Sequence, residues 1–252
     1  GFYYGKEDQP GKHPYHEAGV YYIQEPSAMA PAAYLDAQPG EKVLDLCAAP
    51  GGKSTQIAAA MQGKGLLVSN EIHPARAKIL SENMERMGVK NVMVTNESPQ
   101  TLAGMFTEYF DRIMVDAPCS GEGMFRKNEQ ACEEWSPENV QICAARQQEI
   151  LACAASMLRP GGRMVYSTCT FAPEENEGTI SRFLEQHPQF HIVPVKKYPG
   201  MADGVAAWTE HPAAEIGDTI RLFPHHLHGE GHFVAVLEKE GTVSQNYQGY
   251  CA

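Results

Sequence analysis

Residues 43–57, VLDLCAAPGGKSTQI, decide the fold of this chain. Residues 43–46 form a short, mostly apolar run of the length of a buried strand, and Pro50-Gly51-Gly52 is a turn signal that ends it. Residues 53–61 suit a helix, with apolar side chains four positions apart on one face. The stretch therefore predicts a strand, a glycine turn and the start of a helix.

The glycine turn is suited to a nucleotide-like cofactor. Two adjacent glycines let the backbone come close to a ligand, and the free amide groups of the helix's first turn point outward as donors. The phosphate-binding patterns GxGxxG and GxxxxGKS/T are absent, whereas Asp45 offers a carboxylate to a ligand ammonium group. An acid beside a glycine turn indicates a cofactor with a cationic head and no phosphate, of which S-adenosylmethionine is the obvious example.

A second acid supports this interpretation over that of an ordinary turn between a strand and a helix. The next predicted strand, residues 65–71, ends in Glu71. This residue lies about 20 positions past the glycines, the spacing at which a carboxylate reaches the diol of a bound ribose. Glu71 is therefore the candidate for the ribose contact.

Strands alternate with helices along the rest of the chain. Five further strands are expected at residues 91–95, 112–115, 163–168, 219–223 and 232–237, and helices at residues 73–87, 137–158 and 173–186. This alternation predicts an α/β fold, with a seven-stranded, doubly wound, mostly parallel sheet and helices on both faces. The ligand of such a sheet lies beyond the carboxyl ends of the strands, where Asp45, Glu71, Asp116 and Cys169 stand.

Length and composition fit one large domain. Of the 252 residues, 43% are hydrophobic, enough for a sizeable core. We expect a lead-in segment at residues 1–34, a catalytic domain at 35–240 and a tail at 241–252, the whole being a piece of a longer protein. Neither a signal-peptide pattern nor an apolar run of membrane-spanning length is found, so we expect a cytoplasmic protein. Nothing in the sequence requires a dimer, and a monomer is expected.

The charge and the cysteines limit the function classes. A net charge of -11 argues against nucleic-acid binding by general electrostatics, so any such binding requires a local basic groove. Seven cysteines without paired spacing argue against a disulfide framework. The candidates for the groove are Arg126, Lys127, Lys196, Lys197, Arg163, Arg182 and Arg221, and the cysteines expected to be small buried hydrophobes are Cys132, Cys143 and Cys153.

Two other cysteines, Cys119 in DAPC and Cys169 in STC, each follow a predicted strand. Thiolate attack at C6 of a pyrimidine makes C5 able to accept a methyl group, and a second ionisable group then helps to release the product. Asp116 could bind N3 and the amino group of the base, and Lys53 could lower the pKa of a thiol or orient the ring. Two buried structural thiols are the alternative, and spacing alone does not say which thiol would attack.

These motifs carry a family resemblance. VLDLCAAPGGK, NE, DAPCSGEGM, YSTCT with PEENE, and RLFPHHLHGEGHF resemble, in this order, the Nop/Sun family of RNA cytosine-C5 methyltransferases, and within it the bacterial RsmF type that acts on 16S ribosomal RNA. The resemblance covers about residues 15–237. It implies a class I S-adenosylmethionine-dependent methyltransferase fold with a reversed last strand, and RNA, as rRNA or the small ribosomal subunit, as partner.

The resemblance also implies roles for residues. It makes Cys169 the attacking nucleophile and Cys119 the group that assists product release. The implied cofactor contacts are Cys47, Ala48, Ala49, Pro50, Gly51, Gly52, Lys53, Glu71 and Asp116. The family usually has an acid after the third strand that meets the adenine; motif order places Ser98 there, with Asn96 and Glu97 as alternatives.

Three other functions are weighed against this one. His225, His226, His228 and His232 invite a metal site, but no cysteine pair or HExxH helix accompanies them, and no metal is expected. A methyltransferase for a protein or small molecule would need no thiol at the strand ends. A non-catalytic RNA-binding or ribosome-assembly module would not need every catalytic position to be filled.

Overall fold

The structure, a computed structural model, describes residues 1–127 and 129–242. The tail expected at residues 241–252 lies outside these ranges from residue 243 onward. Within the described ranges no helix combines the length and the apolar character needed to cross a membrane. The expected domain boundaries, cellular location and monomeric state stay predictions.

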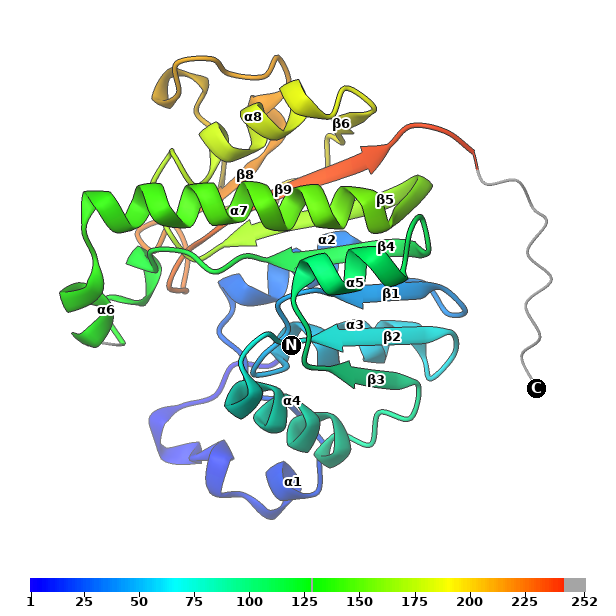
Figure 1. Cartoon of the computed structure of the whole chain (residues 1–252). Helices are drawn as coiled ribbons and strands as arrows, with labels where there is room; N and C mark the ends of the chain where they lie inside the picture. Colours follow the sequence, from blue (N-terminus) through cyan, green and yellow to red (C-terminus); the bar gives the residue numbers. More distant parts are fainter. Residues whose placement is uncertain (128, 243–252) are drawn as a thin grey trace.

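Five parallel strands form one half of the sheet. They run in the spatial order β3-β2-β1-β4-β5, and Figure 1 shows their arrowheads pointing the same way. Their bounds are β1 Lys42–Asp45, β2 Leu66–Asn70, β3 Val92–Thr95, β4 Phe110–Asp116 and β5 Leu158–Thr168. The predicted α/β class with a mostly parallel sheet is confirmed.

The other half of the sheet is antiparallel. Strand β9 pairs with β5 in the opposite direction, as the resemblance implies, and Figure 1 shows it running against β1–β5. It is bordered by β8 and by the short β6, and β7 forms the edge beyond β8. The bounds are β6 Phe190–Ile192, β7 Met201–Asp203, β8 Ile220–Leu222 and β9 His232–Lys239. The described residues thus contain nine strands instead of seven, because β6 and β7 are three-residue strands too short to show a period.

Helices cover both faces of the sheet. On one face α5 Pro99–Met105, α7 Pro137–Met157 and α8 Glu177–Gln186 enclose the larger core, which includes Phe110 and Tyr166. On the other face α2 Ala30–Leu35 and α3 Gly52–Met61 pack against β1, β2 and the antiparallel strands. Helix α4 Pro74–Arg86 packs beside the glycine turn and β3. The short helix α6 Glu129–Glu134 lies beyond the carboxyl end of the sheet, and the short helix α1 Pro14–Glu17 lies beside α4 (Figure 1).

Several boundaries differ from the expectations. Helices α5 and α6 fall where no helix was expected, and α8 begins at Glu177, four residues later than predicted. The sequence RPGG at 159–162 does not separate helix from strand. Strand β5 already begins at Leu158, and the register between β4 and β5 shifts between Phe110 and Arg112, so these residues form an irregular start to the strand.

The lead-in segment crosses the carboxyl end of the sheet. The Arg86 guanidinium of α4 donates to the carbonyl of His16 at 2.7 Å, and Gln24 lies against Gly52 at the start of α3. Farther along, Ser27 reaches residues 231–232, where β9 starts. The segment therefore touches three elements that border the expected ligand site.

Candidate active site

The glycine turn between β1 and α3 forms the floor of a small cavity. Gly51 has φ of 116°, a left-handed conformation that favours glycine, and a side chain at Gly52 would collide with Gln24. The cavity measures about 100 Å³. Its walls are Tyr22, Gln24, Cys47, Ala48, Ala49, Pro50, Gly52, Lys53 and Asp116, so most of the cofactor contacts implied by the resemblance meet here.

Asp45 lies beneath this turn instead of on the cavity wall. Its side chain is fully buried, Oδ2 accepts from the Ser54 hydroxyl at 2.6 Å, and Oδ1 has no hydrogen-bond partner among the described residues. Burial raises the pKa of Asp45 to about 7. Asp45 therefore contacts the first turn of α3 through Ser54 and does not line the cavity itself.

Glu71 stands at the end of β2 and is linked to the same turn through Arg76. Its carboxylate accepts from the His73 amide at 3.0 Å and lies 3.5 Å from the Arg76 guanidinium. Arg76 also donates to the carbonyl of Ala49 at 2.9 Å. This bridge holds the ends of β1 and β2 together.

The three candidates for the adenine contact have different surroundings. The Ser98 hydroxyl caps α5 by accepting from the Thr101 amide at 3.1 Å. The Asn96 amide donates to the carbonyl of Glu71 at 2.6 Å, and the Glu97 side chain is exposed. The assignment to Ser98 stays a prediction.

Lys53 and Asp116 form an ion pair at the floor of the site, with the Lys53 side chain 9% and the Asp116 side chain 30% exposed. The ammonium group lies 2.8 Å from Oδ2 of Asp116, and Oδ1 accepts from the Ser167 hydroxyl at 2.6 Å. Burial by itself would lower the pKa of Lys53, but Asp116, Asp45 and Cys169 outweigh it and hold this pKa above its usual value. Burial would likewise raise the pKa of Asp116, but Lys53 keeps it low. Both groups are therefore charged.

The two strand-end thiols meet beside this pair. Sγ of Cys119 and Sγ of Cys169 lie 3.4 Å apart, although the residues are 50 positions apart in sequence. The hydrogen bond with Cys169, together with burial, raises the pKa of Cys119 well above its usual value. Cys119 is therefore a protonated thiol, while Cys169 lies within the electrostatic influence of the Lys53 ammonium.

Short hydrogen bonds join the two thiol-bearing loops. The Gly123 amide donates to the carbonyl of Cys169 at 2.8 Å, and Glu122 accepts from the Phe171 amide at 2.8 Å. The hydroxyls of Ser120 and Thr170 lie 2.8 Å apart. These contacts fix one loop against the other.

The PEENE segment holds the same loops from behind. Glu175, fully buried, accepts from the Ser120 amide at 3.1 Å and from the Gln147 amide group of α7 at 2.7 Å. Asn176 accepts from the Thr168 hydroxyl at 2.6 Å. Sequence reasoning assigned no role to Glu122, Glu175 or Gln147; the acids in SGEGM and PEENE, both close to a cysteine motif, were the available signal.

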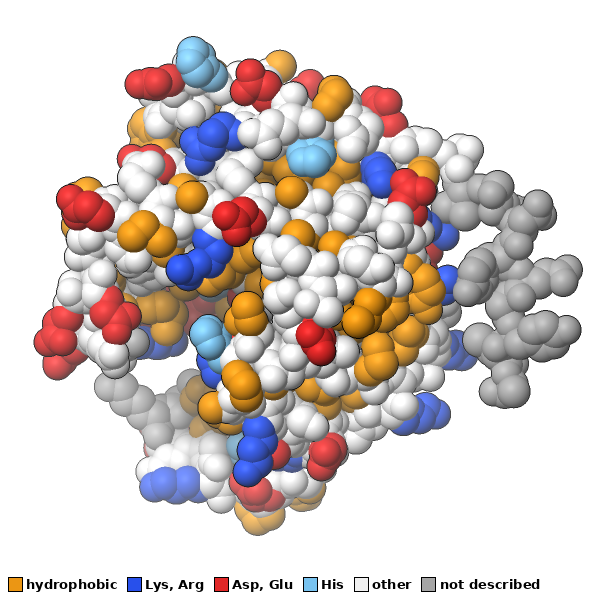
Figure 2. Space-filling view, viewed as in Figure 1, with side chains coloured by type: hydrophobic (Ala, Val, Ile, Leu, Met, Phe, Trp, Pro, Cys, Tyr) orange, Lys and Arg blue, Asp and Glu red, His pale blue; other side chains and the backbone are white. Residues whose placement is uncertain are grey.

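Two other expectations, those for Arg221 and Cys132, are wrong. Arg221 is buried against Glu177 and cannot line a basic groove. Arg126 and Lys127 both pair with Glu230 but are exposed, so their place in a groove stays a prediction. Figure 2 shows basic side chains scattered among acidic ones on the face in view. Cys132 is exposed instead of buried, whereas Cys143 is buried and Cys153 partly so.

The four histidines do not meet at one point, although the ring centroids of His225 and His226 lie 4.1 Å apart. His225, His226 and His228 are exposed, while His232 is buried. Within residues 1–127 and 129–242, no three His, Cys, Asp or Glu side chains are placed to hold a metal ion.

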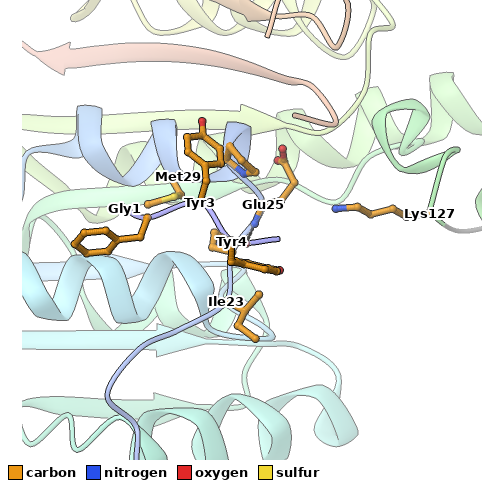
Figure 3. Close-up of a pocket in the computed structure, with 10 residues that line it drawn as sticks. Gly1, Tyr3, Tyr4, Ile23, Glu25, Met29 and Lys127 are labelled. Atoms are coloured by element: carbon orange, nitrogen blue, oxygen red, sulfur yellow. Dashed lines mark hydrogen bonds between the residues drawn. The ribbon is translucent and has the colours of Figure 1, made fainter. Parts of the chain in front are cut away.

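A larger hollow lies next to the cavity. It measures about 740 Å³ and is lined mainly by the lead-in segment, including Tyr3, Tyr4, Gln24 and Glu25. Figure 3 shows Lys127, from the loop after β4, on the opposite side from the lead-in residues. Gln24 borders both spaces.

Comparisons with known proteins identify the family and the fold. Residues 32–238 match the family model described as 16S rRNA methyltransferase RsmB/F. The chain is 41% identical over 231 residues to ribosomal RNA small subunit methyltransferase F of Vibrio vulnificus, covering 91% of this chain and 48% of that protein. It is 40% identical over 250 residues to the protein of that name from Cronobacter sakazakii, covering 96% and 50%. The chain thus spans about half the length of these curated relatives.

Solved structures show the same fold. A methyltransferase homologue from Pyrococcus horikoshii superposes with a TM-score of 0.81 at 31% identity, covering 92% of this chain and 72% of that one. NSun6 from Pyrococcus horikoshii, solved with SFG, gives a TM-score of 0.78 at 28% identity, covering 92% and 56%.

Proposed function

This chain belongs to the 16S rRNA methyltransferase RsmB/F family, and from that premise we propose that it transfers the methyl group of S-adenosylmethionine to C5 of a cytosine in RNA, with 16S rRNA as substrate. The observation that carries the proposal is the 3.4 Å approach of the Cys119 and Cys169 sulfurs beside the charged Lys53–Asp116 pair. A methyltransferase without covalent catalysis would not need this arrangement.

The residues around the glycine turn fit the cofactor. The turn lets a ligand approach the backbone closely, and Glu71 at the end of β2 is the candidate for its ribose. Asp45, whose Oδ1 has no hydrogen-bond partner among residues 1–127 and 129–242, places a carboxyl group with a raised pKa beneath the turn. When bound, S-adenosylmethionine supplies the electrophilic methyl group that C5 accepts. Tyr22 and Gln24 bound the cavity, so the lead-in segment controls its width.

The first chemical step belongs to Cys169. Its sulfur adds as the thiolate to C6 of the cytosine, and the electron pair of the C5–C6 double bond then becomes available at C5. Asp116, held ionised by Lys53, faces the base and is the candidate to bind N3 and the amino group. Burial keeps the thiol of Cys47 protonated by raising its pKa, so Cys47 does not compete as a nucleophile.

The second step is release. After methylation C5 loses its proton to solvent, the double bond re-forms, and the bond between C6 and Sγ of Cys169 breaks. The protonated thiol of Cys119 donates a hydrogen bond to the departing sulfur and stabilises it as a thiolate.

RNA would approach through the larger hollow. The target base must be unpaired or flipped to reach the thiols. The exposed rings of Tyr3 and Tyr4 offer stacking surfaces to neighbouring unpaired bases, and Lys127 offers a cation near them.

Substitution of each cysteine distinguishes the roles of the two thiols. Cys169→Ala should abolish transfer of labelled methyl groups to rRNA while cofactor affinity stays within about twofold, because the mutation removes only the nucleophile. Cys119→Ala should still attack but release slowly, so protein covalently attached to RNA should accumulate on denaturing gels. Cys143→Ala is the matched control, since that buried thiol lies in α7, outside the site.

Two results would contradict the proposal. Methyl transfer by Cys169→Ala would remove Cys169 as the nucleophile. Absence of the covalent species with Cys119→Ala would show that the two thiols do not divide attack and release between them.

A further inference from the structure

His232 is the first residue of the reversed strand β9. The register pairs Ser167 with Val234, and Thr168 with Phe233 is the last pair of the two strands. Paired residues share a face, as do alternate residues of one strand, which places Ser167, Val234 and His232 on the same side of the sheet. His232 also lies within the electrostatic influence of Lys53 and Asp116. Ser167 donates to Asp116 on this face. His232 therefore borders the site from the side of β9.

A chain of hydrogen bonds joins His232 to the lead-in segment. Nδ1 of His232 lies 2.9 Å from the Ser27 hydroxyl, which donates to the carboxylate of Glu25. Glu25 also accepts from the backbone amides of Ala28 at 2.9 Å and Glu230 at 2.8 Å. These bonds outweigh burial and hold the pKa of Glu25 below its usual value, so this carboxylate is ionised.

The chain fixes the tautomer of the imidazole. Ser27 has one hydroxyl proton, and it points to Glu25, which as a carboxylate can only accept. The Gly231 amide donates to the same hydroxyl oxygen at 3.1 Å. Nδ1 of His232 must therefore be the protonated nitrogen, donating to the remaining lone pair of Ser27. Nε2 then carries a lone pair and accepts hydrogen bonds.

Nothing in the described part of the chain uses that lone pair. Nε2 of His232 has no hydrogen-bond partner there, although the side chain is only 6% exposed. Burial and the Lys53 ammonium lower the pKa of His232 to about 4, against the opposing charges of Asp116 and Glu25. The imidazole is therefore neutral, a poor proton acceptor in catalysis but a good hydrogen-bond acceptor.

We propose that Nε2 of His232 accepts a hydrogen bond from the 4-amino group of the target cytosine and so distinguishes cytosine from uracil, an inference that rests on the proposed function. The amino group has two hydrogens to donate. The oxygens of Asp116 already accept from Lys53 and Ser167, and Asp116 can take one of the two. His232, on the same face, accepts the other. Uracil presents an oxygen at this position, and its lone pairs would face that of Nε2.

The test compares two RNAs. One is an unmodified rRNA fragment containing the cytosine that the protein methylates. The other carries pyrimidin-2-one at that position, which has hydrogen in place of the amino group. His232→Phe should lower kcat/KM on the cytosine RNA by about five- to tenfold, the effect of one neutral hydrogen bond, and on the pyrimidin-2-one RNA by less than about twofold. A loss confined to the amino-bearing RNA is a result that a merely structural role would not give.

Further variants secure the interpretation. His232→Gln, whose side-chain oxygen can reach the place of Nε2, should recover part of the loss. Ser27→Ala should show a smaller loss of kcat/KM, again only on the cytosine RNA. Without the Ser27 hydroxyl, the proton of the His232 imidazole is no longer held on Nδ1. His228→Phe, an exposed histidine of the preceding loop, is the control. Equal losses on both RNAs would overturn the role of His232, whereas a wild-type protein that methylates no cytosine at C5 would instead overturn the proposed function.

Discussion

At the scale of single residues, Asp45 illustrates a conflict between burial and charge. Its place at the end of β1 follows from the sequence, because a strand followed by a glycine turn must put its last residues at the ligand edge. Its burial beneath the turn could not be predicted, since that depends on how α3 packs over β1 and on Ser54, which supplies its hydrogen bond. The same applies to Arg221, which reads as a surface cation in sequence but is enclosed against Glu177.

This conflict predicts a pH dependence of stability. The ordinary pKa of 3.8 applies to Asp45 in the unfolded chain, and about 7 in the folded one. Between these values the folded state retains a proton that the unfolded state has lost, so the free energy of unfolding falls as pH rises, by about 1.4 kcal/mol per pH unit at most, and levels off above pH 7. Urea denaturation of wild type and Asp45→Asn between pH 5 and 8 measures this, because the variant should lack that contribution.

The exposed Asp36 provides the control, and Asp36→Asn should follow the wild-type profile. Parallel profiles for wild type and Asp45→Asn would show that Asp45 titrates normally.

At the scale of elements, sequence patterns located the strands that build the site but not the contacts between their loops. Apolar runs and turn signals placed β1, β2 and β4, and hence the edge at which Asp116 and both thiols meet. Periodicity carries no information on which backbone amide an acid will accept from, so Glu122 and Glu175 escaped notice. His232 was noticed only as one of four loop histidines, because its hydrogen-bond partner Ser27 comes from a distant part of the chain.

The contact between the two thiol loops depends on a glycine. A Cβ at Gly123 would lie 2.8 Å from the carbonyl oxygen of Cys169, 3.0 Å from that of Gly231 and 3.2 Å from that of Glu230. Gly123→Ala should therefore push the loops apart and reduce kcat at least about tenfold, since small displacements of reacting groups are costly. Single-turnover methylation, with circular dichroism to verify folding, measures this effect.

Gly104 in α5 gives the matched control, because a Cβ there meets nothing within 4 Å. Gly104→Ala should leave kcat unchanged and stabilise the helix by roughly 0.5–1 kcal/mol. A Gly123→Ala protein with wild-type kcat would show that the loops tolerate separation.

At the scale of the whole molecule, a buried ion pair ties the antiparallel half to α8 and to the loop after Cys169. Arg221 of β8 and Glu177 of α8 are 1% and 0% exposed, and Arg221 also donates to the carbonyl of Phe171 at 3.0 Å. Glu177 further accepts from the Val205 amide at 3.0 Å. The pair therefore joins β8, α8, the loop after Cys169 and the segment around Val205.

Breaking this pair should be costly. Glu177→Gln leaves Arg221 buried without its counter-charge, for which about 3–5 kcal/mol of unfolding free energy is expected to be lost. Chemical denaturation measures the loss. Glu82→Gln, which breaks the exposed pair with Lys78, should change stability by less than about 1 kcal/mol. Similar values for the two variants would mean that solvent reaches Arg221.

The bond between Ser27 and His232 joins residues 205 positions apart. A bond of this span closes a long loop, so it couples the lead-in segment to the last strand of the sheet. Gln24, three residues before Ser27, also bounds the cavity at the glycine turn. Displacement of the lead-in segment would therefore disturb the imidazole and the cavity together.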